Sequence, residues 1–507
     1  MNSGKICISV SAESAAELAG LLSRAEALAD VVELRFDGLD AEGIRNAFEQ
    51  LSSTKQILVT MRPKEQGGRS DRSLTDRIGF WTEYAIHRSI DHPSIWIDHE
   101  YDLRDSKDFM FWVDQCFVIR SKHYFEGQAA DLQKAYDATV SDEEVGKIAV
   151  STRNVTDAIE IWKLLLKANA EGKRLIPIAM GEAGKWTRIL GPAHGAFMTY
   201  AALDAGAETA AGQLTAKDLT ETFRVRELDR STKVYGVLAG NTSYSISPWM
   251  QNAAFKAAGL NSVFVPLQTS DLGEFMSRMV FNGTREIDLN FAGFSVTNPH
   301  KVRIMEFLDE IEDSARVIGA VNTVKIENGR LLGYNTDAYG FISTLEETYG
   351  SLSGARVAVF GAGGAARACV YVLSVRSAGV TVFARNEAAG GSLADEFDAA
   401  YERSASSRKI GEEFDIVVNT TPLGTIGSNE KFAVLEAEQL KGLKLVYDLV
   451  YNPIETELML EAKLASVPSI SGMEMLIAQG VKQFEIWTGI QAPENEMRTA
   501  VMKRLVI

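Results

Sequence analysis

The sequence is 507 residues long, which exceeds what one hydrophobic core usually organises, so we expect two or three domains. Its 68 acidic and 52 basic residues give a net charge of −16, which favours solubility and argues against nucleic acid as the main partner. The cysteines Cys7, Cys116 and Cys369 are widely spaced and show neither a disulfide framework nor a zinc pattern. The N-terminal apolar stretch is too short for a signal peptide and no run reaches transmembrane length, so we expect a cytoplasmic protein.

Residues 1–225 alternate short β-branched runs with longer segments whose apolar residues recur at helical spacing. Repeated βα units of this number and spacing favour a (β/α)8 barrel, in which catalytic residues lie at the carboxyl ends of the strands. The expected strands are Ile6–Val10, Val31–Arg35, Ile57–Met61, Ile95–Asp98, Phe117–Arg120, Gly146–Val150 and Arg174–Ala179.

Polar residues cluster at the carboxyl ends of these expected strands. A single such residue is often part of a structural ion pair, but polar groups at successive strand ends favour one shared site. Lys147 lies inside an apolar, β-branched run, where desolvation favours the neutral, nucleophilic form of an amine. The cluster comprises Glu33, Arg35, Arg62, Asp98, Glu100, Ser121, His123, Lys147 and, farther along the chain, Arg188.

A charged stretch from Arg224 to Lys233 follows, and it is typical of a short interdomain linker. After it come an expected strand, Val234–Leu238, and a helix that begins at Pro248, a favourable first helical position. We expect further βα pairs up to about Asp337.

The βα pattern restarts near Gly354 with a glycine-rich turn. The expected strand Ala355–Phe360 leads into Gly361–Arg367, where small residues allow a tight turn and the close approach of a pyrophosphate. Amides at the start of the next helix would hold its charge. Arg385 follows the next expected strand, Val380–Phe383, and its guanidinium suits a 2′-phosphate, so NADP is favoured over NAD. The alternative for Arg385 is a solvated surface position.

Residues 233–507 resemble shikimate dehydrogenases along nearly their whole length. Eight blocks in the family's order carry the resemblance: Ser245–Pro248, Ser295–Lys301, Gly319–Thr323, Gly333–Asp337, Gly361–Ala366, Asn419–Gly424, Tyr447–Pro453 and Gly472–Gly480. The resemblance implies NADP-linked interconversion of 3-dehydroshikimate and shikimate, with Lys301 and Asp337 as paired catalytic residues. Hydride addition to a ketone builds negative charge on its oxygen, which a cation within hydrogen-bond reach stabilises.

The same resemblance implies further contacts and a domain organisation. The implied substrate contacts are Ser245 and Ser247 for the carboxylate, with Thr297, Asn322, Tyr451 and Gln479. The implied cofactor contacts are Gly361, Ala362, Gly363, Gly364, Ala365, Arg385, Asn419 and Thr420. The expected division is a barrel at 1–225, a linker at 226–232, a substrate-binding domain at 233–340, a Rossmann NADP-binding domain at 341–470 and C-terminal helices at 471–507 that return to the substrate-binding domain.

Residues 1–225 resemble type I 3-dehydroquinate dehydratases. The resemblance is carried by Glu33–Arg35, Thr60–Pro63, Ile97–Glu100, Ser121–His123, Gly146–Val150, Met180–Arg188 and Gly212–Gln213. It implies that Lys147 forms a Schiff base with the substrate ketone and that His123 acts as general acid and base. Glu100 would orient His123, and Arg188 would bind the substrate carboxylate as a bidentate fork. The other implied substrate contacts are Glu33, Arg35, Arg62 and Gln213.

The sequence departs from the two family patterns at several positions. Gln66 stands where the dehydratases usually have a glutamate before Gly-Gly, and Ala196 stands where they have a serine. The turn of Ala384, Arg385 and Asn386 replaces the usual Asn-Arg-Thr of the dehydrogenases. These changes bear on substrate affinity and on cofactor preference, whereas the reactive lysines are retained.

Three functions remain open from the sequence. The first is a bifunctional enzyme that performs dehydration and then reduction. The second is a quinate or shikimate dehydrogenase that uses NAD and has a weakened dehydratase half, and the third is a non-catalytic quinate-sensing regulator. The presence of all the reactive residues favours the enzyme. We expect small-molecule substrates as the only partners, with no nucleic acid, membrane or obligate protein partner, and no metal because the histidines lack metal-ligand spacing.

Overall fold

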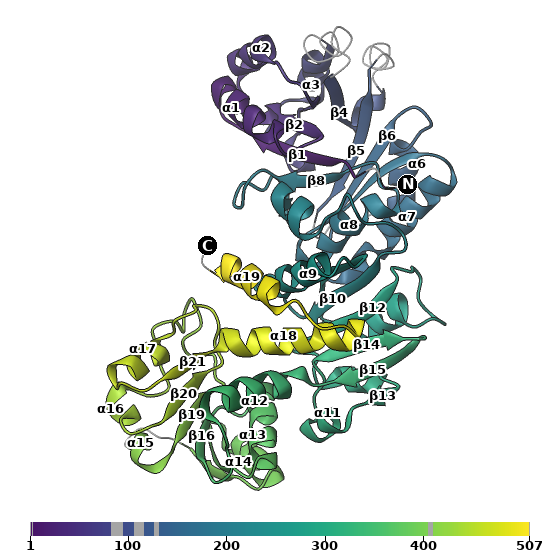
Figure 1. Cartoon of the computed structure of the whole chain (residues 1–507). Helices are drawn as coiled ribbons and strands as arrows, with labels where there is room; N and C mark the ends of the chain where they lie inside the picture. Colours follow the sequence, from purple (N-terminus) through teal and green to yellow (C-terminus); the bar gives the residue numbers. More distant parts are fainter. Residues whose placement is uncertain are drawn as a thin grey trace. The chain divides into compact units, whose positions relative to one another are not determined.

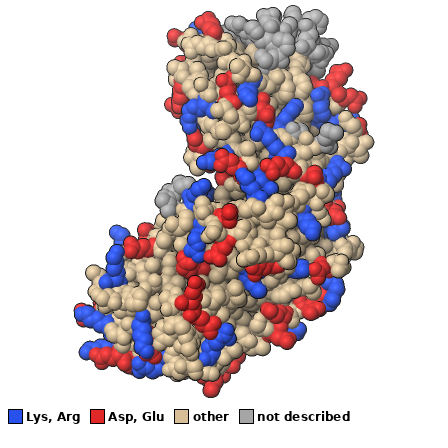
Figure 2. Space-filling model, viewed as in Figure 1, with Lys and Arg blue, Asp and Glu red and all other residues tan. Residues whose placement is uncertain are grey.

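The computed structural model describes residues 2, 4–82, 95–105, 116–125, 131–403 and 409–505. The chain divides into two compact units, Met1–Ser245 with Asn261–Phe291 and Ile246–Leu260 with Ala292–Ile507. Acidic and basic side chains are interspersed over the face shown in Figure 2, so the negative net charge forms no extended surface of one sign there. Among the described helices, none combines the length and the apolar composition that a membrane crossing requires.

The first unit contains a barrel of parallel strands (Figure 1). The strands are β1 (Ile6–Ser11), β2 (Val31–Arg35), β3 (Gln56–Thr60), β4 (Ile95–Glu100), β5 (Val118–Tyr124), β6 (Val145–Ser151), β7 (Arg174–Met180), β8 (Thr199–Ala202) and the short β9 (Leu214–Thr215). Their order, β7-β6-β5-β4-β3-β2-β1-β8-β9, runs around a circle in chain order. The Phe197 backbone amide, just before β8, donates to the Leu175 backbone oxygen near the start of β7 over 3.0 Å. This hydrogen bond joins β7 to β8 and closes the circle. The predicted (β/α)8 barrel is therefore confirmed.

Alternate side chains of the strands fill the barrel interior. Successive strand residues point to opposite faces, so one set faces the barrel axis and the other faces the surrounding helices. All five residues of β2 are buried, as expected of a strand covered on both faces. The interior cluster includes Cys7, Val31, Leu58, Ile119, Val145, Ile176, Met198 and Tyr200.

Helices surround the barrel strands. They include α1 (Ala15–Glu26), α2 (Ala41–Gln50), α3 (Leu74–Phe80), α6 (Leu132–Thr139), α7 (Ile159–Ala170) and α8 (Lys185–Leu190). The side chains of Ser14, Asp40 and Asp131 accept hydrogen bonds from first-turn amides of α1, α2 and α6, which fixes where these helices begin. Trp162 of α7 is fully buried and packs on Trp186 of α8, with ring centroids 4.7 Å apart.

The predicted linker is held against the barrel. Arg226 forms an ion pair with Asp30 at 2.7 Å, and Asn2 Nδ2 donates to the carbonyl oxygens of Val225 and Leu228 at 2.7 and 2.6 Å. Residues 226–232 are therefore a packed connection. The first unit continues with β10 (Lys233–Ala239), β11 (Ser262–Gln268), which pairs in parallel with β10, and α10 (Leu272–Phe275).

The second unit contains antiparallel strands that the sequence analysis did not predict. They belong to β12 (Phe291–Val296), β13 (Glu310–Ile311), β14 (Thr323–Glu327) and β15 (Arg330–Tyr334). β14 is antiparallel to both β12 and β15, and β13 is parallel to β15. The expectation of only βα pairs up to Asp337 is wrong because Asn328 and Gly329 form a tight turn between β14 and β15. Both have positive φ angles, 53° and 79°, which suit a two-residue hairpin turn.

Two long helices of the second unit pack closely against each other. The helices around these strands are α9 (Ser247–Ala257), α11 (Asp313–Ile318), α12 (Thr336–Tyr349), α18 (Gly472–Thr488) and α19 (Glu494–Leu505). α12 and α18 lie side by side (Figure 1). A Cβ atom on Gly340 would lie 2.8 Å from the backbone nitrogen of Gln479, so this approach requires glycine. Trp487 of α18 donates to the Val324 oxygen over 3.0 Å, which connects the helix to β14.

A Rossmann sheet forms the other part of the second unit. Its strands are β16 (Arg356–Phe360), β17 (Gly379–Phe383), β18 (Ala400–Glu402), β19 (Ile416–Asn419), β20 (Leu445–Asp448) and β21 (Ser469–Ser471), and its helices are α13 (Gly364–Val375), α14 (Glu387–Glu396), α15 (Ile410–Glu413), α16 (Ala437–Leu440) and α17 (Glu457–Leu464). The order β18-β17-β16-β19-β20-β21 is that of a dinucleotide-binding sheet, with its reversal point between β16 and β19. Separate apolar clusters cover its two faces. The predicted Rossmann fold is confirmed.

The close contact at Gly340 predicts that a single methyl group added there lowers the free energy of unfolding. In Gly340→Ala the added Cβ would lie within 2.9 Å of Gln479 and the Met475 oxygen, so α12 and α18 must move apart. We expect a loss of about 1–3 kcal/mol of unfolding free energy, measured by urea denaturation. Gly391→Ala on α14 is the matched control, because nothing lies within 4 Å of its Cβ. It should gain about 0.5–1 kcal/mol, and equal effects of the two substitutions would contradict the packing argument.

Candidate active sites

A cavity of about 140 Å³ opens at the carboxyl ends of the barrel strands. Parallel strands bring their carboxyl ends to one mouth of the barrel, so residues far apart in sequence converge there. Of the strand-end residues predicted from the sequence, Asp98, Glu100 and Ser121 lie outside the lining. The lining includes Glu33, Arg35, Arg62, Gln66, His123, Lys147, Arg188, Tyr200 and Gln213.

Lys147 is buried among polar partners. Its Nζ donates to Asp98 Oδ2 at 2.8 Å and to the Tyr200 hydroxyl at 3.0 Å, and it lies 3.5 Å from Glu33 Oε1. Lys147 as a whole is 4% exposed. The burial agrees with the expectation, but the apolar surroundings expected from the strand sequence are not found. The other strands β4, β2 and β8 supply two carboxylates and a phenol across the barrel interior, which the local sequence of β6 does not contain.

Asp98 is the negative partner shared by two buried cations. Its Oδ2 lies 2.9 Å from Arg62 Nη2 and 2.8 Å from Lys147 Nζ, and Ser121 Oγ donates to Oδ1 at 2.6 Å. Burial alone would raise the pKa of Asp98, but the charges of Arg62 and Lys147 hold it below its usual range. Asp98 is therefore ionised in the resting site and fixes the position of Nζ.

His123 lies on β5, beside the strand that carries Lys147. The register pairs His123 with Ala149, two residues beyond Lys147. Its backbone amide donates to Gln66 Oε1 at 2.9 Å, while its buried Nδ1 has no hydrogen-bond partner among the residues that the structure describes. Burial, followed by the positive charges of Arg62 and Lys147, lowers the pKa of His123 well below its usual value. The imidazole is therefore neutral at physiological pH, the form that accepts a proton.

Glu100 is paired with arginines. Arg62 Nη1 donates to Oε1 at 2.9 Å and Arg77 Nη1 donates to Oε2 at 3.0 Å. The structure therefore does not show the expected contact in which Glu100 orients His123, because two buried guanidinium groups engage both carboxylate oxygens. Burial raises the pKa of Glu100 to about 7, although the two arginines oppose this shift. Glu100 instead holds Arg62 at the edge of the cavity.

Arg188 presents a buried cation to the cavity, and no described carboxylate pairs with it. It is 2% exposed and its Nη2 donates weakly to the Ala211 oxygen at 3.4 Å, while its Nε and Nη1 have no partner within the described part of the chain. Burial lowers the pKa of Arg188 to about 10. By contrast, Arg35 is bound by Asp37 at 2.6 and 2.8 Å. The free donors of Arg188 fit a planar, anionic group such as a carboxylate.

A buried histidine near this site makes stability depend on pH. His99 is fully buried with Nδ1 2.9 Å from the Glu100 oxygen, and burial lowers its pKa from 6.5 to about 4. Between these pH values the unfolded chain binds a proton that the folded chain excludes, so stability should fall as the pH falls from about 6.5 to about 4. Urea denaturation across this range should show a shallower slope for His99→Gln than for the parent. Equal slopes would contradict the assignment.

In the second unit, Lys301 and Asp337 form an ion pair, with Nζ 2.6 Å from Oδ2. Asp337 lies in the first turn of α12, where the helix dipole favours a negative charge. Asn322 Nδ2 donates to the other carboxylate oxygen at 2.8 Å, and Asn322 Oδ1 accepts the Thr336 amide at 2.7 Å. Asp337 Oδ2 thus holds the Lys301 ammonium group, and Asp337 Oδ1 is fixed by the side-chain amide of Asn322.

The other residues predicted to bind the second substrate occupy different elements. Ser245 ends the first segment of the first unit, while the rest belong to the second unit. Ser247 begins α9, Thr297 directly follows β12, Tyr451 follows β20, and buried Gln479 lies on α18, which packs on the helix of Asp337. Gln479 Nε2 donates to the Leu476 oxygen at 2.8 Å.

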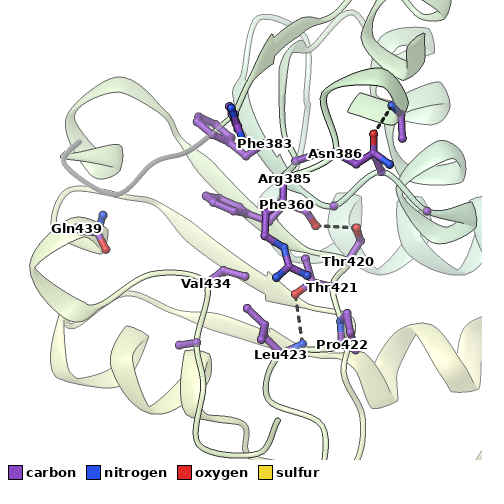
Figure 3. A pocket seen from close by; sticks show the side chains of 17 residues that line it. Phe360, Phe383, Arg385, Asn386, Thr420, Thr421, Pro422, Leu423, Val434 and Gln439 are labelled. Atoms are coloured by element: carbon purple, nitrogen blue, oxygen red, sulfur yellow. Dashed lines mark hydrogen bonds between the residues drawn. The ribbon is translucent and has the colours of Figure 1, made fainter. Parts of the chain in front are cut away.

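A larger cavity, of about 770 Å³, lies at the carboxyl ends of β16, β17 and β19 (Figure 3). Gly361 has φ +117°, and a Cβ there would meet Thr420 Oγ1 at 2.2 Å, so this position requires glycine. Of the predicted cofactor residues, Gly361, Ala362, Gly363, Arg385 and Thr420 line the cavity, whereas Gly364, Ala365 and Asn419 do not. Asn419 is buried and accepts the Thr421 amide at 3.0 Å, which shapes the loop that follows β19.

Two features of this cavity suit a phosphorylated dinucleotide. Helix α13 begins at Gly364, and its N-cap Gly363 has no side chain to satisfy the first amides, so these remain available to a pyrophosphate. Space around both glycines is open, since a Cβ on either meets nothing within 4 Å. Two arginines, Arg385 and Arg403, line the cavity and supply charge for a 2′-phosphate.

Three site residues escaped the sequence analysis. Tyr200 lies on a β8 strand that no sequence pattern identified, Arg77 lies on α3, and Arg403 follows the short strand β18. Only the fold brings them to their partners. The strand register and the β17–β18 pairing could not be read from local patterns, although the Thr-Tyr-Ala-Ala run at 199–202 has strand character.

The barrel carries a buried lysine site and the Rossmann sheet carries a dinucleotide-type cavity. The fold and these sites are those of a two-part α/β enzyme. Family models match it as type I 3-dehydroquinase at residues 6–230, shikimate dehydrogenase substrate binding domain at 237–324 and shikimate 5′-dehydrogenase C-terminal domain at 472–502. A bifunctional 3-dehydroquinate dehydratase/shikimate dehydrogenase of Arabidopsis thaliana, described as chloroplastic, is 31% identical over 97% of this chain and 83% of its own.

The dehydrogenase part has single-function relatives. A shikimate dehydrogenase (NADP(+)) of Methanocaldococcus jannaschii is 38% identical over 55% of this chain and 99% of its own. A crystal structure of a shikimate dehydrogenase in complex with NADP+ matches with a TM-score of 0.50 and 37% identity, over 55% of this chain and 97% of that one. The chain belongs to the family of bifunctional 3-dehydroquinate dehydratase/shikimate dehydrogenases.

Proposed function

We propose that the chain converts 3-dehydroquinate to 3-dehydroshikimate in the barrel and then reduces 3-dehydroshikimate to shikimate with NADPH in residues 233–507. The observation that carries the first half is the barrel cavity, which combines a buried lysine, a neutral imidazole and an unpaired buried guanidinium. The family membership supports both halves. The cytoplasmic location stays a prediction, and the Arabidopsis relative is described as chloroplastic.

In the dehydration step, Lys147 forms an iminium with the substrate ketone. The iminium withdraws electrons and acidifies the adjacent carbon–hydrogen bond. His123, neutral and with an unpartnered nitrogen, takes that proton and later returns one to the departing hydroxyl group. Arg188 holds the substrate carboxylate through its free donors, which places the ketone beside Nζ.

The remaining cavity residues position these groups and contact the substrate. Glu33 accepts from Thr60 Oγ1 at 2.9 Å and lies near Nζ, so it shares with Asp98 the proton that the lysine must lose before it attacks. Arg62 is held by Asp98 and Glu100, so its guanidinium presents a fixed positive charge to substrate oxygens at the cavity wall. The polar groups proposed to complete the substrate contacts are Arg35 and Gln213.

In the reduction step, Lys301 stabilises the negative charge that develops on the ketone oxygen and donates a proton to it. Asp337, 2.6 Å away, orients the ammonium group. When bound, NADPH supplies the hydride. We propose that the substrate contacts of this site are Ser245, Ser247, Thr297, Asn322, Tyr451 and Gln479, and that the cofactor contacts are Gly361, Ala362, Gly363, Gly364, Ala365, Arg385, Asn419 and Thr420.

The covalent role of Lys147 predicts a trapped adduct. Borohydride added during turnover of 3-dehydroquinate should reduce the iminium and increase the mass of the peptide that contains Lys147 by that of the reduced substrate. Lys163→Ala is the control, because Lys163 is a surface residue paired with Glu160 at 3.0 Å. It should trap like the parent, and Lys147→Ala should not trap. An unmodified peptide during parental turnover would refute covalent catalysis by Lys147.

The separate locations of the two lysines predict that the activities can be separated by mutation. Lys301→Ala should lower the rate of 3-dehydroshikimate reduction by about 10²–10⁴-fold, because the charge and proton donor are lost, and leave dehydration unchanged. Lys325→Ala is the matched control, since Lys325 pairs with Glu327 at 2.6 Å on β14, outside the proposed site. Steady-state rates of both reactions provide the measurement. Loss of dehydration in folded Lys301→Ala would argue against independent sites.

A further inference from the structure

Tyr200 contacts the reactive nitrogen of the barrel site, yet the steps proposed above give it no role. Its side chain lines the cavity and is 3% exposed. The hydroxyl lies 3.0 Å from Lys147 Nζ, and Nζ lies 4.0 Å from the centroid of the ring. This contact joins β8 to β6 across the barrel interior, because the two strands are not neighbours in the sheet.

The hydrogen bonds around Nζ leave the proton of the phenol available. A lysine ammonium has three N–H donors and no acceptor, and here its partners are Asp98, Glu33 and the Tyr200 oxygen. The phenol oxygen therefore accepts from Nζ, and its own proton points to another group. Among the described residues, none accepts a hydrogen bond from the Tyr200 hydroxyl, whose contact is with Nζ. The proton can reach an oxygen bound beside Nζ in the cavity.

We propose that Tyr200 is a catalytic proton relay that carries a proton from Lys147 to the ketone oxygen of the substrate while the Schiff base forms. The inference rests on the proposed function, since it needs attack by Lys147 on a ketone. Conversion of an ammonium and a ketone to an iminium and water moves two protons from nitrogen to oxygen. The phenol, 3.0 Å from Nζ, is placed to transfer one of them.

The steps balance as follows. Nζ passes one proton to the Asp98 carboxylate, 2.8 Å away, which frees its lone pair. The N–C bond forms and the electron pair of the C=O bond moves to oxygen. Tyr200 gives its proton to this oxygen and takes one from Nζ, which yields a neutral carbinolamine. The C–O bond then breaks, the nitrogen lone pair completes the iminium, and the proton held by Asp98 leaves with the hydroxyl group as water.

The environment keeps the relay in its protonated form. Burial, followed by the negative charge of Glu33, raises the pKa of the Tyr200 phenol well above its usual value, so the group returns to the neutral phenol after each transfer. A relay and a purely structural phenol predict different rates of imine formation for Tyr200→Phe. Phenylalanine keeps the ring packed in the barrel interior, and Nζ keeps both carboxylate partners, so a structural phenol would leave imine chemistry unchanged.

Oxygen exchange isolates the imine step from the rest of the reaction. The full chain is incubated with 3-dehydroshikimate in ¹⁸O-enriched water without NADP(H), and incorporation of the label into the ketone is followed by mass spectrometry. Each cycle of imine formation and hydrolysis exchanges that oxygen. We expect Tyr200→Phe to lower the enzyme-dependent exchange rate by about 10²-fold, the usual contribution of a positioned acid–base group.

Two controls make the outcomes distinct. Tyr136→Phe removes a phenol that donates to Glu171 at 2.7 Å on the outside of the barrel, and it should exchange at the parental rate. Reduction of 3-dehydroshikimate with NADPH and the circular dichroism spectrum should both be parental in Tyr200→Phe, which shows that both parts of the chain are folded. Parental exchange in Tyr200→Phe would overturn the relay while the Schiff base stands. Absence of exchange in the parent would instead refute the Schiff base at Lys147, and the relay with it.

Discussion

The buried contact between Lys147 and Asp98 is the interaction on which the barrel site depends. A charge removed from water is tolerated only when a partner and hydrogen bonds replace the solvent. Asp98 is the common partner of Lys147 and Arg62, at 2.8 and 2.9 Å, so it holds the nucleophile and one wall of the cavity in register. Glu100 extends this network to Arg77, with both of its oxygens engaged. In the same cavity, Arg188 Nε and Nη1 have no partner among the described residues, which agrees with the proposal that they bind the substrate carboxylate.

The two lysines illustrate how surroundings set chemical roles. Lys147 is enclosed by carboxylates and a phenol that can accept and return its protons, which supports the proposed role as a nucleophile that becomes an iminium. Lys301 is partly exposed, with a quarter of its side chain accessible, and has one oriented carboxylate partner at a helix start. These surroundings suit the proposed role of Lys301, in which its positive charge stabilises the ketone oxygen. Dehydration produces the ketone that the second site reduces, so their order along the chain matches the order of the reactions.

Sequence patterns predicted the parts of the molecule that depend on local periodicity. The alternation of β-branched and helical segments predicted the barrel, and the glycine-rich turn after β16 predicted the Rossmann sheet. The β14–β15 hairpin was missed although Asn328-Gly329 is a readable signal. The partners of Lys147 were harder to predict, because Asp98 and Tyr200 come from other strands and only the register and the barrel closure bring them to Nζ. The pairing of Glu100 with Arg62 and Arg77, in place of an orienting contact to His123, also depends on tertiary structure.

A coupled assay tests the central claim, that one chain performs both reactions. Purified protein is given 3-dehydroquinate and NADPH, with no other enzyme, and the loss of NADPH absorbance is recorded. The account predicts oxidation of NADPH after a short lag, with shikimate as the product and no reaction when either Lys147 or Lys301 is replaced by alanine. Reduction of added 3-dehydroshikimate without any oxidation driven by 3-dehydroquinate would contradict a catalytic barrel, and a failure with both substrates would contradict the account as a whole.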